Sequence, residues 1–254
     1  MNPLSRPLVR GALGGAMFML VACSSGPGPS GNAADSQAAT GFAREGGGTL
    51  FMVLVAALKT LLHCYLAQDD VRVATNVANR NRPGTAGLIG PLVNTVILRI
   101  GLSGDPTPRE LLGRVRESVL AAFAHQDVPI EAIAQSLSRE SGGKPAALAN
   151  IMLLFQNATL RSFPRSGRKL VIEEASPSTM LPLVTPPGFD VILMLHEGAH
   201  GLRGTCVYKP HLFGAKTIDR LLQNFQNVLE CMVTRPDRPI STIGVSLNEP
   251  RLNW

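Results

Sequence analysis

The chain has 254 residues, of which 45% are hydrophobic, so it can bury the core of one large domain or of two small ones. The formal net charge is +6, but the basic residues are dispersed, apart from Arg80 and Arg82 in one loop and a group at 161–169 in another. A nucleic-acid-binding surface needs clustered as well as net positive charge, so the composition argues against nucleic acid as a partner.

Residues 1–22 have the organisation of a secretory signal peptide. Arg6 and Arg10 precede an apolar run at 11–22, and Cys23 follows it. The run is too short for a transmembrane helix, which needs about 20 apolar residues. The sequence Leu-Val-Ala-Cys at 20–23 resembles the bacterial lipobox, in which the cysteine thiol is acylated and becomes the mature N-terminus.

We therefore expect lipidation at Cys23 and a lipoprotein held at a membrane. The alternative is an apolar N-terminus created by a misassigned start or a gene rearrangement, and the protein would then be cytoplasmic. Residues 23–41 are rich in Gly, Ser and Pro, a composition typical of the flexible tether of exported lipoproteins.

The other three cysteines form no CxxC pair and show no metal-ligand spacing. Cys64 and Cys231 lie in helical apolar patterns, and Cys206 lies in a strand pattern. We expect all three to be buried free thiols.

Helices and strands are predicted in alternation after the tether. Residues 49–66 are apolar on nearly every side, which indicates a buried helix. β-Branched residues predict strands at 71–77 and 92–100. Thr107 and Glu110 form a capping box with Pro108 at the first helical position, so a helix begins there.

Further apolar patterns extend this alternation. The capped helix places Leu111, Val115, Val119 and Phe123 on one face, and a second helix after Asp127 has Ile130, Ile133 and Leu137 as its inner stripe. Further strands are predicted at 151–156, 169–173, 189–195 and 202–208. The last helix repeats apolar residues at spacings of three, four and seven, namely Ile218, Leu221, Leu222, Phe225, Val228, Leu229 and Met232. The pattern is mixed α/β, with strands buried on both faces.

Two segments resemble motifs of a known family. LIGPLVNTVILR at 88–99 and AHQDVPIE at 124–131 resemble, in order and spacing, the fifth and sixth core motifs of condensation domains of nonribosomal peptide synthetases. IMLLFQNA at 151–158 and FDVILMLHEGAHGLRGTCVY at 189–208 resemble further segments of the family. The resemblance covers 42–247 and leaves 248–254 as a tail. It implies the fold of chloramphenicol-acetyltransferase-like enzymes, in which two similar lobes, each a mixed sheet flanked by helices, enclose a tunnel.

The catalytic motif of that family is absent from the chain. This motif, two adjacent histidines followed after three residues by Asp-Gly, lies upstream of the other two, and no two histidines here are adjacent. The resemblance thus implies the C-terminal lobe alone, with no catalytic residue and no cofactor of its own. The parent activity would be amide formation between acyl groups bound to the phosphopantetheine of carrier proteins.

The implied partners are a missing N-terminal lobe and the carrier proteins. The alternative function is a lipid-anchored binding module that has reused the lobe as a scaffold. Carrier proteins and activated amino acids are cytoplasmic, so an exported condensation domain would lack its substrates.

Four residues of the two motifs are candidate site residues. The resemblance places Asn94 and Arg99 on the tunnel wall, although Asn94 could equally satisfy neighbouring backbone groups and Arg99 could form a structural ion pair. His125 and Asp127 resemble a general base with its orienting acid. Their position at a helix junction favours structure instead, with Asp127 as a helix N-cap and His125 closing the preceding helix.

Residues 196–200 spell the zinc-peptidase pattern HExxH. Zinc chemistry needs both histidines one turn apart on a helix. Here Gly198 and Gly201 bracket the junction between two predicted strands. The sequence therefore predicts a β-hairpin at this place and no metal site.

Overall fold

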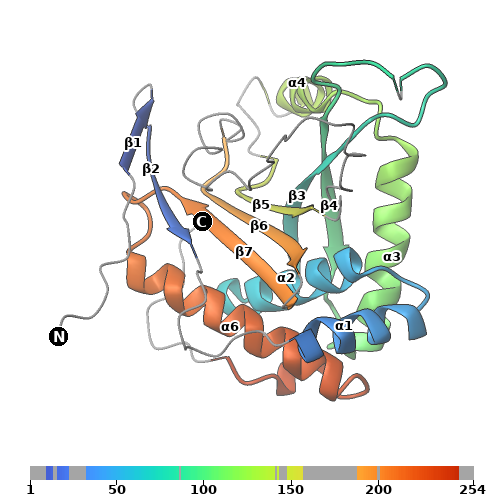
Figure 1. Cartoon of the computed structure of the whole chain (residues 1–254), viewed down its shortest axis with the longest axis vertical. Helices are drawn as coiled ribbons and strands as arrows, with labels where there is room; N and C mark the ends of the chain where they lie inside the picture. The colour runs from blue at the N-terminus through green and yellow to red at the C-terminus, as the bar shows by residue number, and fades with distance from the viewer. Residues whose placement is uncertain are drawn as a thin grey trace, which may run out of the picture.

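A mixed β-sheet and a layer of helices make up the structure, a computed structural model that describes residues 10–13, 16–22, 33–85, 87–140, 142, 148–156, 188–198 and 201–245 (Figure 1). The elements, in chain order, are β1 (Arg10–Leu13), β2 (Ala16–Ala22), α1 (Ala33–Glu45), α2 (Leu50–Leu66), β3 (Asp70–Val77), β4 (Asn94–Gly101), α3 (Pro108–Ala124), α4 (Ile130–Glu140), β5 (Ile151–Gln156), β6 (Val191–Gly198), β7 (Gly201–Tyr208), α6 (Ala215–Thr234) and a 3₁₀ turn (Ile240–Thr242).

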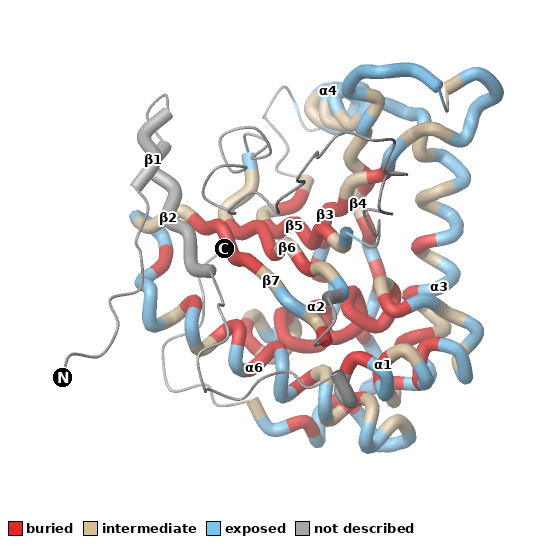
Figure 2. Tube along the Cα trace, viewed as in Figure 1, coloured by how far each residue is buried: buried red, intermediate tan, exposed pale blue. Residues whose placement is uncertain are grey.

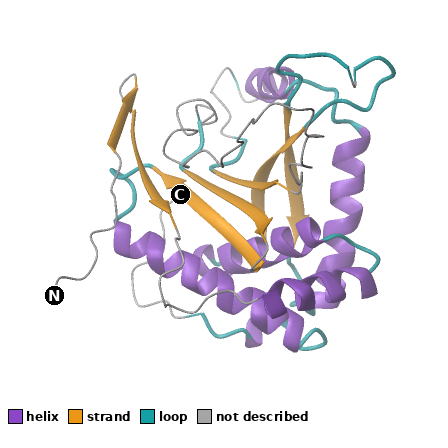
Figure 3. Ribbon diagram, in the orientation of Figure 1, coloured by secondary structure: helices purple, strands orange, loops and turns teal. Residues whose placement is uncertain are grey.

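The strand order is β1-β2-β7-β6-β5-β3-β4. β5 pairs in parallel with both β3 and β6, while the other pairs are antiparallel. The crossover between parallel strands β3 and β5 runs through β4, α3 and α4, as parallel strands require a long connection. Figure 3 shows the helices gathered on one side of the sheet, with α4 apart from them at one end.

The main core lies between the sheet and helices α1, α2, α3 and α6 (Figure 2). α2 is its centre, since most of its residues are buried, including the full turn Leu54–Leu58. Thr49 caps the helix by accepting a hydrogen bond from the N–H of Met52. A smaller core on the opposite face of the sheet includes Met152 and Ile192, so the central strands are buried on both faces. The prediction of a mixed sheet flanked by helices is confirmed.

The capping box at Thr107 forms as predicted. Its hydroxyl accepts from the N–H of Glu110, and the Glu110 carboxylate accepts from the N–H of Thr107. α6 buries one complete stripe, Ile218, Leu221, Leu222, Asn224, Phe225, Val228 and Met232. Of the cysteines, Cys206 is buried, but Cys64 and Cys231 are only partly buried.

The structure corrects the predicted tether. Its second half belongs to α1, in which Ala39, Phe42 and Ala43 are buried in the main core. The Gly/Ser/Pro composition that indicates flexibility ends before Ala33, and the Ala-rich segment after it forms a helix because Ala has the highest helix propensity. Cys23 and the predicted strand at 169–173 lie outside the described residues.

The apolar run of the predicted signal peptide includes strand β2. β2 pairs in antiparallel fashion with β7, with Met19 opposite Tyr208 and Ala22 opposite Thr205. Within the described part of the chain, no single helix has the length and apolarity of a membrane span. One pair of helices, Ser36–Glu45 and Leu50–Leu66, reaches them together, but it is bent by 100° and its second helix is core.

Candidate functional site

The two motif segments meet at one end of the molecule, where β4 begins, α3 ends and α4 follows (Figure 1). Asn94, the first residue of β4, joins them. Its Nδ2 donates to the carbonyl of Gln126 at 2.8 Å and to the carbonyl of Val128 at 2.7 Å. One amide group therefore fixes the α3–α4 turn onto the strand. This is the backbone-satisfying role that the sequence allowed, and a tunnel-wall role for Asn94 stays a prediction.

A second link joins the same turn to the loop between β3 and β4. Arg82 Nη2 lies 2.5 Å from Asp127 Oδ2. The hydrogen bond from the guanidinium holds the pKa of the Asp127 carboxyl below its usual range. The predicted N-cap role of Asp127 is wrong, because α4 starts after Pro129, whose carbonyl accepts the first helical N–H groups.

His125 closes α3 as predicted. It is the C-cap residue, and its backbone N–H donates to the carbonyls of Ala122 and Phe123. The His125–Asp127 pair therefore consists of a helix-terminating residue and a carboxylate bound to Arg82. Both observations support the structural interpretation of this motif over a general-base dyad.

Arg80 shapes the loop that leads into β4, a role that sequence reasoning missed. Its guanidinium donates to the carbonyls of Thr85 at 3.0 Å, Leu88 at 2.7 Å and Gly90 at 3.0 Å. The signal available in the sequence was a pair of arginines, Arg80 and Arg82, shortly before a Pro-Gly turn (Pro83-Gly84). This combination predicts a loop but not which carbonyls bend around the side chain.

The same end of the molecule carries exposed apolar side chains. Among the described residues, eight large hydrophobic side chains are exposed, and six of them lie on the loop at 88–93, in the α3–α4 turn or on α4: Leu88, Ile89, Val93, Val128, Ile133 and Leu137. We call these six residues the apolar end surface. The prediction that Ile133 and Leu137 form an inner stripe is wrong, because no residue of α4 is buried.

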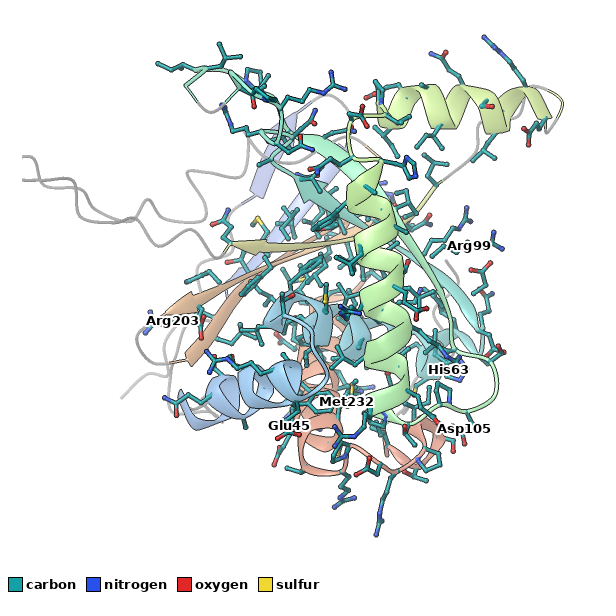
Figure 4. All side chains as sticks on the ribbon, turned by 90° about the vertical axis from the view of Figure 1, so that its right-hand side faces the viewer. Glu45, His63, Arg99, Asp105, Arg203 and Met232 are labelled. Carbon is teal, nitrogen blue, oxygen red and sulfur yellow. The ribbon has the colours of Figure 1, made fainter. Side chains whose placement is uncertain are left out.

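Arg99 lies near the other end of β4, away from these residues (Figure 4). Its Nε is 3.0 and 2.9 Å from the two carboxylate oxygens of Asp70, and its Nη2 is 2.7 Å from Oδ2. This hydrogen-bonded pair lowers the pKa of Asp70. The contact is the structural ion pair that was one of the two interpretations, and the tunnel-wall role stays a prediction.

The first three residues of the HExxH string, His196, Glu197 and Gly198, end the first strand of the predicted β-hairpin. β6 ends at Gly198 and β7 begins at Gly201, and these two glycines are opposite each other in the ladder. His196 and Glu197 are consecutive strand residues, so they point to opposite faces of the sheet. Glu197 accepts a hydrogen bond from Ser36 Oγ at 3.1 Å, which connects α1 to the hairpin. His200 lies outside the described residues, and the absence of zinc stays a prediction.

Solved structures share this fold at low sequence identity. The X-domain from teicoplanin biosynthesis matches 96% of the chain with a TM-score of 0.75 and 23% identity, and the match spans 52% of that structure. The first condensation domain of the CDA synthetase matches 91% with a TM-score of 0.68 and 17% identity, and the match spans 49% of it. The fold is therefore that of about half of a condensation-type domain.

Sequence comparison gives the family directly. The profile described as "Condensation domain" matches residues 31–249. A linear gramicidin synthase from Brevibacillus parabrevis is 39% identical over 206 residues, which are 81% of this chain and 4% of that protein. Surfactin synthase subunit 1 from Bacillus subtilis is 36% identical over 200 residues, 78% of this chain and 5% of that protein. The chain belongs to the condensation-domain family of nonribosomal peptide synthetases, and it spans only a small part of these relatives.

Proposed function

We propose that this chain is the C-terminal half of a condensation domain and forms amide bonds between carrier-bound groups only together with an N-terminal half that carries the paired histidines. One observation carries the proposal. The chain matches about half of the two solved neighbours described above, and the paired-histidine motif that the family places in the other half is absent here. The N-terminal half could come from the same polypeptide or from another one.

The described histidines offer no substitute for the missing pair. His63 lies on α2, with Nδ1 2.9 Å from the carbonyl of Gln68 and 3.3 Å from Asp69, at the opposite end of the molecule from α4 (Figure 4). His125 terminates α3, His196 lies on β6, and His211 lies in the exposed turn before α6. Since each belongs to a different segment, they do not provide the adjacent pair of the family motif.

Positioning is the second requirement that a single lobe leaves unmet. Holding two reactants in the correct geometry contributes several kcal/mol to a bimolecular reaction, about 7–11 kcal/mol in the most favourable cases. A tunnel needs two walls to hold them and to exclude water. One lobe supplies one wall, so we expect substrates to remain solvated on it.

The relatives also bear on the partners. Those named above are peptide synthases, which supports carrier-bound acyl groups as substrates. A lipid-anchored binding module has no counterpart among them. Attachment to a membrane through Cys23 remains a separate proposal that rests on the N-terminal sequence.

The test is reconstitution. The purified chain would be mixed with donor- and acceptor-loaded carrier proteins, with or without the N-terminal half of the matching condensation domain of the linear gramicidin synthase, and products would be identified by mass spectrometry. We expect amide product only when both halves are present. An N-terminal half with both motif histidines changed to alanine is the control and should restore nothing. Product formation by the chain alone would overturn the proposal.

A further inference from the structure

A row of three polar side chains crosses neighbouring strands on the face of the sheet opposite the main core. Gln156 of β5 lies opposite His196 of β6, and His196 lies opposite Arg203 of β7. Residues directly opposite each other on neighbouring strands point to the same face of a sheet, and their Cβ atoms are about 5 Å apart. We call these three residues the polar row.

The smaller core shows which face of the sheet carries the polar row. Side chains alternate between the two faces along a strand, so Met194 and Ile192 share the face of His196. Ile192 belongs to the smaller core and Met194 packs against it, as part of a cluster that also includes Leu154 of β5 and Val207 of β7. The polar row therefore continues this face at the carboxyl ends of the parallel strands β5 and β6.

The side chains of the polar row are accessible and unpaired. Gln156 and Arg203 are exposed and His196 is partly exposed. Within the part of the chain that the structure describes, no side-chain hydrogen bond or ion pair is made by any of the three. Figure 4 shows the Arg203 side chain at the periphery of the molecule. Glu197, next to His196, points to the other face, where it accepts the hydrogen bond from α1.

The acidic residues that share the face of the polar row lie at its opposite end and already have basic partners. Asp190, just before β6, is six residues from His196, which is about 20 Å along an extended strand, and it binds Lys209 at 2.6 Å. Asp70, the first residue of β3, binds Arg99 at 2.7 Å. Among the described strand residues, no carboxylate on this face therefore neutralises the polar row.

We propose that the polar row is a binding site for a small oxyanion, a phosphate or a carboxylate. The proposal goes beyond the proposed function and does not depend on it. A guanidinium presents its N–H donors in a planar fork that matches two oxygens of such an anion. The imidazole N–H of His196 and the amide N–H groups of Gln156 are further donors beside it. The site lies at the carboxyl ends of parallel strands, the end at which open α/β sheets bind ligands.

Charge decides between an anion and a metal ion at this place. His196 is the first histidine of the HExxH string, and a histidine by itself is suited to either ligand. Arg203 lies directly opposite His196, and its permanent positive charge repels a metal cation and attracts an anion. The neighbour on the adjacent strand therefore assigns His196 to an anion site.

The experiment is an NMR titration of the ¹⁵N-labelled full chain. Three salts would be added at matched ionic strength, namely sodium phosphate, sodium acetate and sodium chloride. We expect saturable shifts of the backbone amides of Gln156, His196 and Arg203 with phosphate, acetate or both, and the two salts identify which oxyanion the site prefers. Chloride, which has no oxygens for the guanidinium fork, should give no saturable shift.

Substitutions on the same face provide the matched control. Arg203→Gln should weaken oxyanion binding about tenfold or more, because charge-assisted hydrogen bonds are lost. Arg203→Lys keeps the charge and loses the fork, so it should weaken binding less than Arg203→Gln does. Arg72→Gln makes the same change of net charge at an exposed arginine of this face, at its opposite end, and should bind as the parent chain does. His196→Phe keeps an aromatic ring without its N–H groups and should also weaken binding.

Three results would overturn the proposal. The first is the absence of saturable shifts in the polar row with both phosphate and acetate. The second is equal weakening by Arg203→Gln and Arg72→Gln, which would show general attraction to a basic chain. The third is a saturable shift of His196 with zinc chloride and none with the oxyanions. Since the titration uses this chain alone, none of these results bears on the need for an N-terminal half, which the reconstitution tests separately.

Discussion

Lys59 predicts an unusual pH dependence of stability. This lysine lies on α2 in the main core and is fully buried, and its Nζ donates to the carbonyl of Val71 at the start of β3. Burial lowers the pKa of Lys59 from 10.5 to about 8, against the opposing effect of Asp70. The folded protein therefore binds this proton more weakly than the unfolded chain does.

The sign and size of the pH effect on stability follow from this difference in proton binding. Between pH 8 and 10.5 the unfolded chain holds the proton and the folded protein has released it, so stability rises with pH by about 1.4 kcal/mol per unit. Over the whole window the gain is about 3 kcal/mol. Above pH 10.5 the cost of burying a charged Lys59 is absent. Below pH 8 this cost lowers the stability in full.

The assay is urea unfolding of the parent chain and of Lys59→Met at pH 7, 8, 9 and 10. Methionine has a similar volume and no charge, so the difference between the two proteins isolates the lysine titration. We expect the parent chain to gain about 3 kcal/mol relative to the variant across the window. Leaving the Val71 carbonyl without its donor adds a cost that does not depend on pH. Lys59→Arg, which stays charged at every pH, should show no rise. A parent-minus-variant difference that is flat or falls with pH would refute the reasoning.

Four further predictions concern single sites. Asn94→Asp should lower the free energy of unfolding more than Asn94→Ala, because a carboxylate would face the two carbonyls that the amide now binds; equal losses in urea unfolding would argue against this role. Gly204→Ala should lower the free energy of unfolding by about 1–3 kcal/mol, since a Cβ there would lie 2.5 Å from Leu195 Cδ2 and 3.1 Å from the Met194 carbonyl. A Cβ at Gly113 in α3 meets nothing within 4 Å, so Gly113→Ala should raise the free energy of unfolding by up to about 1 kcal/mol. Mass spectrometry should find acylated Cys23 as the first residue of the mature chain, and an unmodified cytosolic chain starting at Met1 would contradict this. Calorimetry should detect no stoichiometric zinc binding, and one-to-one uptake lost in His200→Ala would contradict the hairpin argument.

Local signals in the sequence were sufficient for elements whose cause is local. Thr107, Pro108 and Glu110 predict the start of α3 because the capping box involves only neighbouring residues. The periodic stripe of α6 predicts a buried face, and helices α1 and α2 cover it. For α4, periodicity predicted the position of the helix correctly, but the prediction that its apolar stripe is buried was wrong. Periodicity shows that a helix is amphipathic, but whether its apolar face is covered depends on segments far away in the chain.

The candidate site also combines features with local causes and features that depend on distant segments. His125 as a helix terminus followed from its place between two helical patterns. That Asn94 binds the carbonyls of Gln126 and Val128 could not be read from spacing, because those partners are more than thirty residues away and their approach depends on how α3 packs on β4. The role of Arg80 was hidden for a related reason, since a loop's carbonyl directions are set only once the loop has closed.

The pairing of β2 with β7 in the sheet conflicts with removal of β2 as part of a signal peptide. If residues 1–22 are a signal peptide, cleavage would remove β2, which is hydrogen-bonded to β7 in the folded structure. If the segment at 20–23 acts as a lipobox, folding before export would therefore leave it uncut. Cleavage first would release a protein whose β7 has an open edge, the kind of edge to which strands of other chains add. Whether folding or cleavage comes first, more than the final stability of the uncleaved or the cleaved protein, would then decide which of the two forms the cell contains.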